Sequence, residues 1–120
     1  MLTGIDHVQL TIPAGAEHLP VARHLYVDAL GLIEVEKPEP LRDRGGIWFS
    51  GGTFEVHLGV EDPLETRRHP GFLTDNLEAV RARLSAQDVE FEDQPPLGDR
   101  DRLHFRDPFG NRIEVVEYRR

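Results

Sequence analysis

Apolar and polar residues alternate along several segments of this chain, and such alternation predicts β-strands. Residues 5–13 place Val8 and Leu10 on one face and His7 and Gln9 on the other, which is typical of a half-buried strand. The alternation on either side of Gly51-Gly52 predicts a β-hairpin that turns there. Further strands are predicted over residues 32–36, 69–74, 89–92, 103–107 and 112–118, the last two joined by a turn at 108–111.

Two segments have apolar residues at helical spacing instead. Residues 17–30 form the first predicted helix, which Gly31 ends. The second follows Asp75, a candidate N-cap residue with Glu78 three residues later. The segments 38–46, 61–68 and 94–98 lack either period and predict loops.

The order strand–helix–strand–strand–strand therefore occurs twice, and a repeat of this kind constrains the fold. We predict an α+β fold in a single domain, residues 1–120. It consists of two βαβββ modules, 1–60 and 69–120, joined by a linker at 61–68. Because a sheet must bury its apolar face, we expect each helix to cover one face of its own module's sheet.

Strand parity separates this helix-covered face from an opposite, more polar face. Ile113 and Val115 share the apolar face, which leaves Glu114 in the middle of the opposite one. A carboxylate buried there without a partner costs several kcal/mol, so either that face is wet or Glu114 has a cation. The same parity places three histidines on the corresponding faces of their strands: His7, His57 and His69.

The spacing of these four residues is similar in the two modules. His7 precedes His57 by 50 residues, and His69 precedes Glu114 by 45. Each pair occupies the first and last strands of its module. Three imidazoles and one carboxylate are a suitable ligand set for one divalent metal ion, and the set suits Zn, Ni, Mn, Fe or Co. The sequence thus predicts a metal site at these positions, where the ion would neutralise Glu114.

Other side chains share the parity of these candidate ligands. His104 is a candidate general acid or base, because imidazole titrates near neutral pH. Arg102 or Arg106 could hold an anionic substrate group, because a guanidinium forks onto carboxylate or phosphate. Gln9 and Glu55 are further candidates for substrate contact, and Trp48 is a candidate for either substrate contact or packing.

Composition restricts the classes of function. The net charge of −8 and the pI near 5.1 argue against binding to the phosphates of nucleic acid. No apolar run approaches the roughly 20 residues of a membrane span, so no membrane association is expected. The N-terminus lacks a basic region followed by an apolar one, and we therefore expect a cytoplasmic protein. The absence of cysteine excludes disulfides and thiolate ligands.

Three stretches of the chain carry a family resemblance: GIDHVQLTI at the start, RHPGF with DNLEAVRARL in the middle, and DPFGNRIEVVE at the end. They resemble the vicinal oxygen chelate superfamily, which includes glyoxalase I, fosfomycin-resistance proteins, methylmalonyl-CoA epimerase, extradiol dioxygenases and bleomycin-resistance proteins. The resemblance covers both modules and implies curled mixed sheets around a metal-binding cleft. It implies His7, His69 and Glu114 as common ligands, with His57 at the variable fourth place. Metal-dependent glyoxalase I enzymes usually carry Glu at that place.

The resemblance also implies a reaction class. A divalent metal would chelate vicinal oxygens of a small substrate, in lyase, isomerase or related transferase chemistry. It would stabilise the negative charge that grows in the transition state, while His104 or a displaced Glu114 moves a proton. Two alternatives stay open. One is a metal-free, drug-binding protein of the bleomycin-resistance type, and the other is an iron-dependent ring-cleaving dioxygenase, which shares the His, His, Glu set.

A homodimer is the expected assembly. The linker at 61–68 has eight residues and spans at most about 25–30 Å, which permits the modules to pair within one chain or between two. Small two-module enzymes of the family usually pair modules across a two-fold axis. By resemblance, His7 and His57 of one subunit would meet His69 and Glu114 of the other in a composite site.

Overall fold

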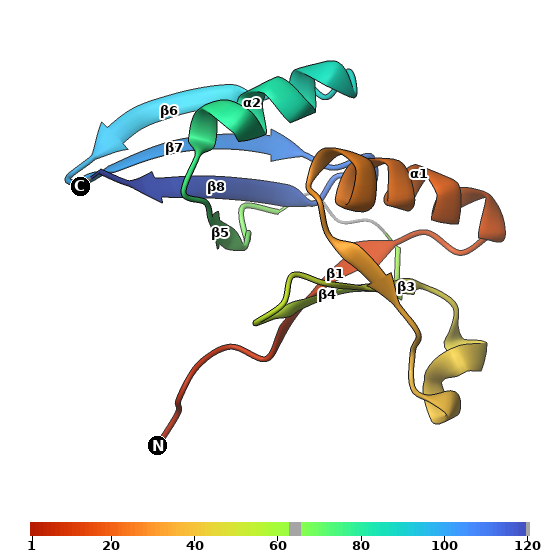
Figure 1. Ribbon diagram of the computed structural model, residues 1–120. Helices are drawn as coiled ribbons and strands as arrows, with labels where there is room; N and C mark the ends of the chain where they lie inside the picture. The colour runs from red at the N-terminus through yellow and green to blue at the C-terminus, as the bar shows by residue number, and fades with distance from the viewer. Residues whose placement is uncertain (63–65, 120) are drawn as a thin grey trace. The chain divides into compact units, whose positions relative to one another are not determined.

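The structure is a computed structural model that describes residues 1–62 and 66–119 (Figure 1). The chain divides into two compact units, Met1–Pro63 and Leu64–Arg120, called unit 1 and unit 2 below. Part of the linker predicted at 61–68 lies outside the described residues. Each unit contains one four-stranded mixed sheet.

Unit 1 has its sheet strands in the order β1-β4-β3-β2. Strands β1 and β4 are parallel, and the other neighbours are antiparallel. The elements in chain order are β1 (His7–Ile12), η1 (Ala16–His18), α1 (Leu19–Arg23), η2 (His24–Ala29), β2 (Ile33–Val35), η3 (Glu39–Arg44), β3 (Ile47–Ser50) and β4 (Glu55–Val60).

Unit 2 repeats this arrangement with the strand order β5-β8-β7-β6. The neighbouring strands β5 and β8 are parallel, as β1 and β4 are in unit 1. Its elements are β5 (Gly71–Leu73), α2 (Leu77–Ala86), β6 (Glu92–Leu97), β7 (Arg100–Arg106) and β8 (Arg112–Tyr118). The predicted α+β fold with a repeated βαβββ order is therefore confirmed.

The helical segment of unit 1 differs in detail from the single helix predicted at 17–30. It begins as a 3₁₀ turn, continues as α1 and ends in the π-helical stretch η2, where the N–H of Leu30 donates to the carbonyl of Leu25 at 2.9 Å. The wider π turn lets Leu25, Tyr26 and Ala29 all be buried. The Tyr26 ring lies 5.2 Å from that of Phe49 on β3, so this stretch packs on the sheet of its own unit.

In unit 2, α2 lies over one face of the sheet (Figure 1). Leu77 and Leu84 of the helix are buried, as are the sheet residues of matching parity, Leu103, Phe105, Ile113 and Val115. The helix begins one residue later than predicted, so Asp75 is not its N-cap. Asn76 is the cap, and its side-chain oxygen accepts a hydrogen bond from the N–H of Ala79 at 3.0 Å.

This cap gives a direct stability test. Asn76→Ala should lower the free energy of unfolding by about 1 kcal/mol, because the N–H of Ala79 loses its acceptor. Asp75→Ala is the matched control and should change it by less than about 0.5 kcal/mol, as expected for a surface position. Urea denaturation followed by circular dichroism measures both. Equal losses in the two variants would contradict the assignment of the cap.

Strand β6 corrects another prediction. The sequence predicted a strand at 89–92 and a loop at 94–98, whereas one strand runs from Glu92 to Leu97. It contains Pro95 and Pro96, which an edge strand tolerates because one of its sides makes no ladder hydrogen bonds. The pairing with β7 also shifts register between Gln94 and Leu97. The strand predicted at 69–74 shortens to β5, and the loop predicted at 38–46 contains η3.

The two predicted hairpin turns are present. Gly52 has φ 97° and Gly110 has φ 89°, a region that glycine enters at little cost. Buried Asp107 organises the second turn, since its Oδ1 accepts hydrogen bonds from the N–H groups of Phe109 and Asn111. This turn fixes the register of β7 against β8.

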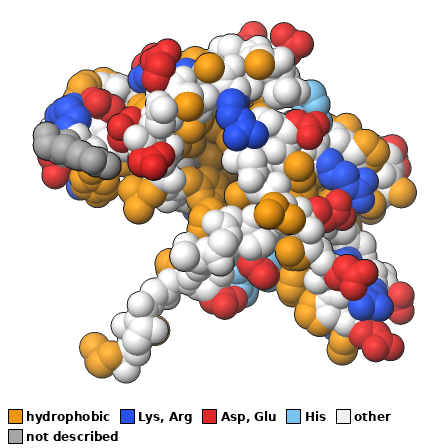
Figure 2. Space-filling model, in the orientation of Figure 1, with side chains coloured by type: hydrophobic (Ala, Val, Ile, Leu, Met, Phe, Trp, Pro, Cys, Tyr) orange, Lys and Arg blue, Asp and Glu red, His pale blue; other side chains and the backbone are white. Residues whose placement is uncertain are grey.

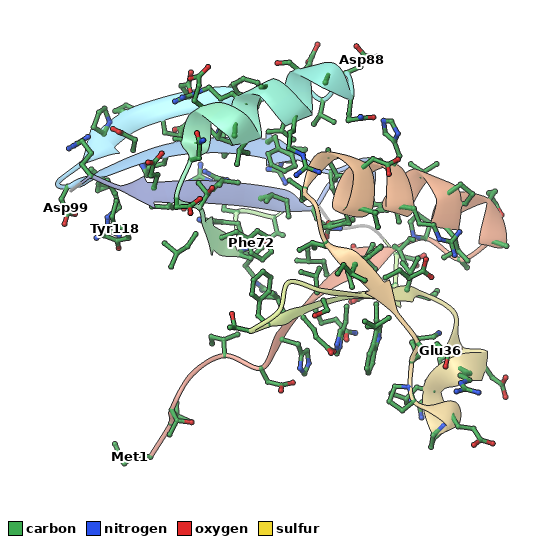
Figure 3. The ribbon with its side chains drawn as sticks, in the orientation of Figure 1. Met1, Glu36, Phe72, Asp88, Asp99 and Tyr118 are labelled. Carbon is green, nitrogen blue, oxygen red and sulfur yellow. The ribbon has the colours of Figure 1, made fainter. Side chains whose placement is uncertain are left out.

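The far end of the β7–β8 ladder holds the labelled residues Asp99 and Tyr118 (Figure 3). There the guanidinium of Arg100 lies 4.6 Å from the centre of the Tyr118 ring. On the face shown in Figure 2, acidic and basic side chains are interspersed. Among the described residues, no helix has the length and apolarity needed to cross a membrane.

Candidate metal centre

The two units place their candidate ligands at equivalent positions. His7 is paired in register with Glu55, so His57 lies two residues beyond the partner of His7. In unit 2, Gly71 is paired with Glu114, so Glu114 lies two residues beyond the position level with His69. His57 is thus the counterpart of Glu114. The internal repeat predicted from sequence therefore relates the ligand positions themselves.

The strands β3 and β7, which pair antiparallel with β4 and β8, also carry residues at equivalent positions in the two units. Trp48 on β3 is paired with His57, and His104 on β7 is paired with Glu114. Side chains of paired residues point to the same face of a sheet. His104 therefore shares a face with Glu114, opposite buried Leu103, as strand parity predicted.

In unit 1, three aromatic rings form a stack. The Trp48 and His57 rings are parallel to within 3°, with centroids 3.5 Å apart. His7 covers the ring of His57 at 4.3 Å. The His57 side chain is only 6% exposed, whereas that of His7 is 43% exposed. Trp48 therefore contacts His57 directly and restricts the orientation of its ring.

Each histidine of this stack has one ring nitrogen held by a carboxylate. His7 Nδ1 lies 2.8 Å from Asp6 Oδ2, and His57 Nε2 lies 2.8 Å from Glu55 Oε1. A carboxylate accepts, so these nitrogens donate. The lone pairs of neutral His7 and His57 are then on Nε2 and Nδ1, respectively. A carboxylate on the second nitrogen is typical of metal-binding histidines.

In unit 2, His69 is held in the same way by a carbonyl. Its Nδ1 lies 2.9 Å from the oxygen of Arg67 and must donate to it. Its Nε2 lies 3.2 Å from Glu114 Oε2. In neutral His69 a lone pair would thus face a carboxylate oxygen, and two acceptors repel each other. A proton or a metal ion is needed between them.

Glu114 also has a cation from its own unit. Its side chain is 16% exposed, and its Oε1 accepts a hydrogen bond from Arg102 Nη1 at 2.9 Å. The pair runs diagonally between β7 and β8, since the register partner of Arg102 is Val116. Arg102 also donates to the carbonyl of Pro95. One carboxylate oxygen is therefore held by arginine while the other faces His69.

The other residues predicted at the site are placed as follows. His104 Nδ1 lies 3.2 Å from Arg112 Nη2, and its Nε2 lies 3.2 Å from Glu92 Oε2 and 3.0 Å from Gln94 Nε2. Arg106 donates to the carbonyls of Thr66 and Gly110. The exposed Gln9 side chain lies over Gly59, where a Cβ would come within 2.4 Å of its amide nitrogen.

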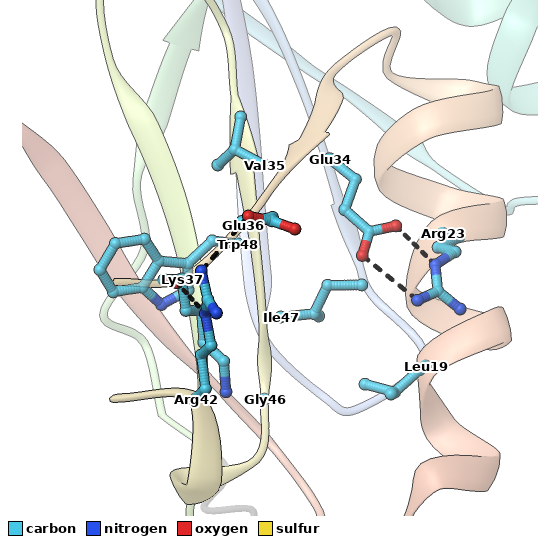
Figure 4. A pocket seen from close by; sticks show the side chains of 10 residues that line it. All are labelled: Leu19, Arg23, Glu34, Val35, Glu36, Lys37, Arg42, Gly46, Ile47 and Trp48. Atoms are coloured by element: carbon cyan, nitrogen blue, oxygen red, sulfur yellow. Dashed lines mark hydrogen bonds and ion pairs between the residues drawn. The ribbon is translucent and has the colours of Figure 1, made fainter. Parts of the chain in front are cut away.

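Unit 1 also contains a pocket of about 240 Å³ that Trp48 helps to line (Figure 4). Arg23 donates two hydrogen bonds to Glu34, of 2.7 and 3.2 Å, and this side-chain hydrogen bonding raises the pKa of Arg23. Lys37 donates to the carbonyl of Gly45. Of the predicted site residues that the structure describes, Trp48 alone lines this pocket.

Comparisons with known proteins agree with this geometry. The family model described as Glyoxalase/Bleomycin resistance protein/Dioxygenase superfamily matches residues 4–115. A glyoxalase family protein from Bacillus anthracis is 39% identical, with a TM-score of 0.91 over 99% of this chain and 98% of that one. The chain belongs to the glyoxalase/bleomycin resistance protein/dioxygenase superfamily. This confirms the resemblance to the vicinal oxygen chelate proteins.

More distant superfamily structures share the fold alone. Lactoylglutathione lyase from Agrobacterium tumefaciens is 22% identical, with a TM-score of 0.75 over 98% of this chain and 95% of that one. The fosfomycin resistance protein FosX from Listeria monocytogenes is 17% identical, with a TM-score of 0.76 over 98% and 94%. No curated protein matches the chain.

The candidate donors of this superfamily member lie two in each unit. Within neither unit do the described residues form a group of three or more His, Asp or Glu side chains that could hold a metal ion. Unit 1 offers His7 and His57, and unit 2 offers His69 and Glu114. The donor chemistry fits a divalent ion, because imidazole nitrogens and carboxylate oxygens are common ligands and each imidazole has one ring nitrogen 2.8–2.9 Å from an oxygen.

Sequence reasoning missed three residues that support this site. Arg112 has the parity of Glu114, so alternation could have revealed it. Asp6 adjoins a candidate ligand, but only the structure shows its contact with His7. Glu117 Oε1 accepts a hydrogen bond from the N–H of Leu77 at 2.7 Å, at the start of α2, and only the structure shows this contact.

Proposed function

We propose that this superfamily member is a metalloenzyme with one divalent ion bound by His7, His57, His69 and Glu114. The observation that supports it is the state of the three imidazoles. Each has one ring nitrogen 2.8–2.9 Å from an oxygen, and the second nitrogen of His69 lies 3.2 Å from Glu114 Oε2. Histidines that merely pack or lie at a surface do not need this shared arrangement.

The proposed site requires two units, because each offers only two of the four ligands. We propose that they come from different chains of a homodimer, with two sites related by the two-fold axis. A metal bound only by the assembled dimer would stabilise that assembly by mass action. The ring stack in unit 1 and the Arg102–Glu114 pair in unit 2 would hold each half in place before the halves meet.

The proposed reaction is a lyase, isomerase or related transferase step on a small substrate with vicinal oxygens. When bound, the divalent ion would act as a Lewis acid on those oxygens. The residues of the chain would orient the substrate and move protons. His104 would move the proton, because it shares the sheet face of its register partner Glu114 and imidazole serves as a general acid or base. Arg102 would remain beside Glu114 and stabilise negative charge on that face.

One observation favours a second function, the metal-free drug-binding protein. Arg102 already pairs with Glu114, so that carboxylate has a counter-charge without a metal. In this alternative the histidines would line a binding cleft and contribute no ligands.

Metal analysis distinguishes the two functions. The purified protein, stripped with a chelator and reloaded with Co²⁺, should bind about one ion per chain and show the visible absorption of a Co²⁺ ion with nitrogen ligands. Elemental analysis of the protein as isolated would identify iron, as a ring-cleaving dioxygenase requires. Absence of bound Co²⁺ at concentrations far above that of the protein would overturn the metalloenzyme in favour of the binding protein.

A further inference from the structure

The sheet face that carries Glu114 also places two arginines directly opposite each other. Arg106 on β7 and Arg112 on β8 are register partners next to the hairpin turn. Like charges at directly opposed positions destabilise a sheet. The chain has a net charge of −8, so carboxylates outnumber basic side chains. Nevertheless, the register partner of each of these two arginines is the other arginine and not a carboxylate.

Neither arginine has a carboxylate partner among the residues that the structure describes. Arg112 is half-buried, and its Nη2 lies 3.2 Å from His104 Nδ1. Its Nε is covered and has no hydrogen-bond partner in the described part of the chain. Arg106 donates to two carbonyl oxygens, those of Thr66 at 3.2 Å and Gly110 at 2.9 Å. The hydrogen bonds of these two arginines are thus to an imidazole and to carbonyl oxygens.

The nearest carboxylate along the chain, that of Asp107, accepts hydrogen bonds from groups of the turn itself. Asp107 is buried in the turn between the two strands, with Oδ1 accepting two backbone N–H groups and Oδ2 accepting the side-chain amide of Asn111 at 2.7 Å. By contrast, Arg102, two residues before His104 on the same face, is neutralised by Glu114. The turn end of this face therefore carries two arginine side chains that have no ion pair among the described residues, with the Asp107 carboxylate buried in the turn between their strands.

We propose that Arg106 and Arg112 form an anion subsite, and that the substrate carries a carboxylate or phosphate-type group in addition to its chelating oxygens. Arg112 lies two residues before Glu114 on β8, which separates the subsite from the proposed metal ligand by about 7 Å of strand. A bound anion would relieve the repulsion between the two guanidinium groups. The assignment of this anion to a substrate rests on the proposed function.

A first experiment tests the subsite without metal. Inorganic phosphate should raise the Tm of the metal-free protein relative to sodium chloride of equal ionic strength. The rise should disappear in the double variant Arg106→Gln/Arg112→Gln. Arg81→Gln is the matched control, because it removes an arginine of α2 that pairs with Asp93 and Glu78 instead, and it should retain the rise.

A second experiment tests the two-point binding on protein loaded with Co²⁺. Glutaric acid monohydroxamate and its methyl ester share a chelating end and differ in the charge of the other end. The acid should bind wild-type protein about tenfold or more tightly than the ester by calorimetry, since hydrogen bonds to charged groups are strong. The double variant should bind both equally. Arg112→Lys should retain part of the preference for the acid, because lysine keeps the positive charge but lacks the planar guanidinium that donates two parallel hydrogen bonds.

The outcomes separate the two proposals. A phosphate effect in a protein that binds no Co²⁺ would support the anion subsite and overturn the metal site. Co²⁺ binding with equal affinity for acid and ester would overturn the anion subsite and leave the metal site standing. A preference for the acid that survives in the double variant would also overturn this assignment.

Discussion

Glu114→Gln should lower the affinity for Co²⁺ by about 100-fold or more, because loss of an outer-shell partner alone costs about 10–100-fold and Glu114 is a proposed direct ligand. The substitution keeps the shape and one oxygen but removes the charge. In the metal-free protein it should also lower the free energy of unfolding by about 1–3 kcal/mol, since Arg102 loses its charged partner in a largely buried setting. Competition with a chromophoric chelator measures the first effect, and urea denaturation the second.

Glu92→Gln is the control for both measurements. Glu92 lies in the same row of the sheet, paired with His104, but its side chain is 79% exposed and is not a proposed ligand. This variant should bind Co²⁺ as wild type does. A Glu114→Gln protein with lower stability and unchanged metal affinity would mean that Glu114 serves only as the partner of Arg102.

Strand parity was the part of the fold that the sequence predicted well. Successive side chains of a strand point to opposite faces wherever the strand begins or ends. For that reason Glu114 and His104 could be placed on one face even though several strand ends were wrong. The same argument holds for Arg112, whose chemistry was overlooked although its parity was available.

Side-chain contacts between neighbouring strands could not be predicted from the sequence. The Arg102–Glu114 pair is a diagonal across β7 and β8, and the Trp48–His57 stack depends on the pairing of β3 with β4. Each requires the register between strands, which the hairpin turns determine. The N-cap also moved from Asp75 to Asn76, because both residue types cap helices and only the packing of Leu77 decides where α2 begins.

Composite sites predict a recovery of metal binding when two defective chains are mixed. His7→Ala damages unit 1 and Glu114→Gln damages unit 2, so neither homodimer would have an intact site. In a mixed dimer whose sites are shared between chains, the intact unit 1 of one chain meets the intact unit 2 of the other. One site is then complete and the second has both defects, which gives about half of the wild-type Co²⁺ content. If each site formed within one chain, every site of the mixed dimer would contain a defect.

The mixed dimer can be isolated with a different affinity tag on each chain, after unfolding and refolding the two variants together. His7→Ala mixed with His57→Ala is the matched control: both defects lie in unit 1, so no intact site can form by either arrangement. Size-exclusion chromatography with light scattering should show a dimer that dissociates more readily after chelation, because ligands that span two chains link metal binding to assembly. A monomer at micromolar concentration, or a mixed dimer that binds no more Co²⁺ than this control, would rule out composite sites.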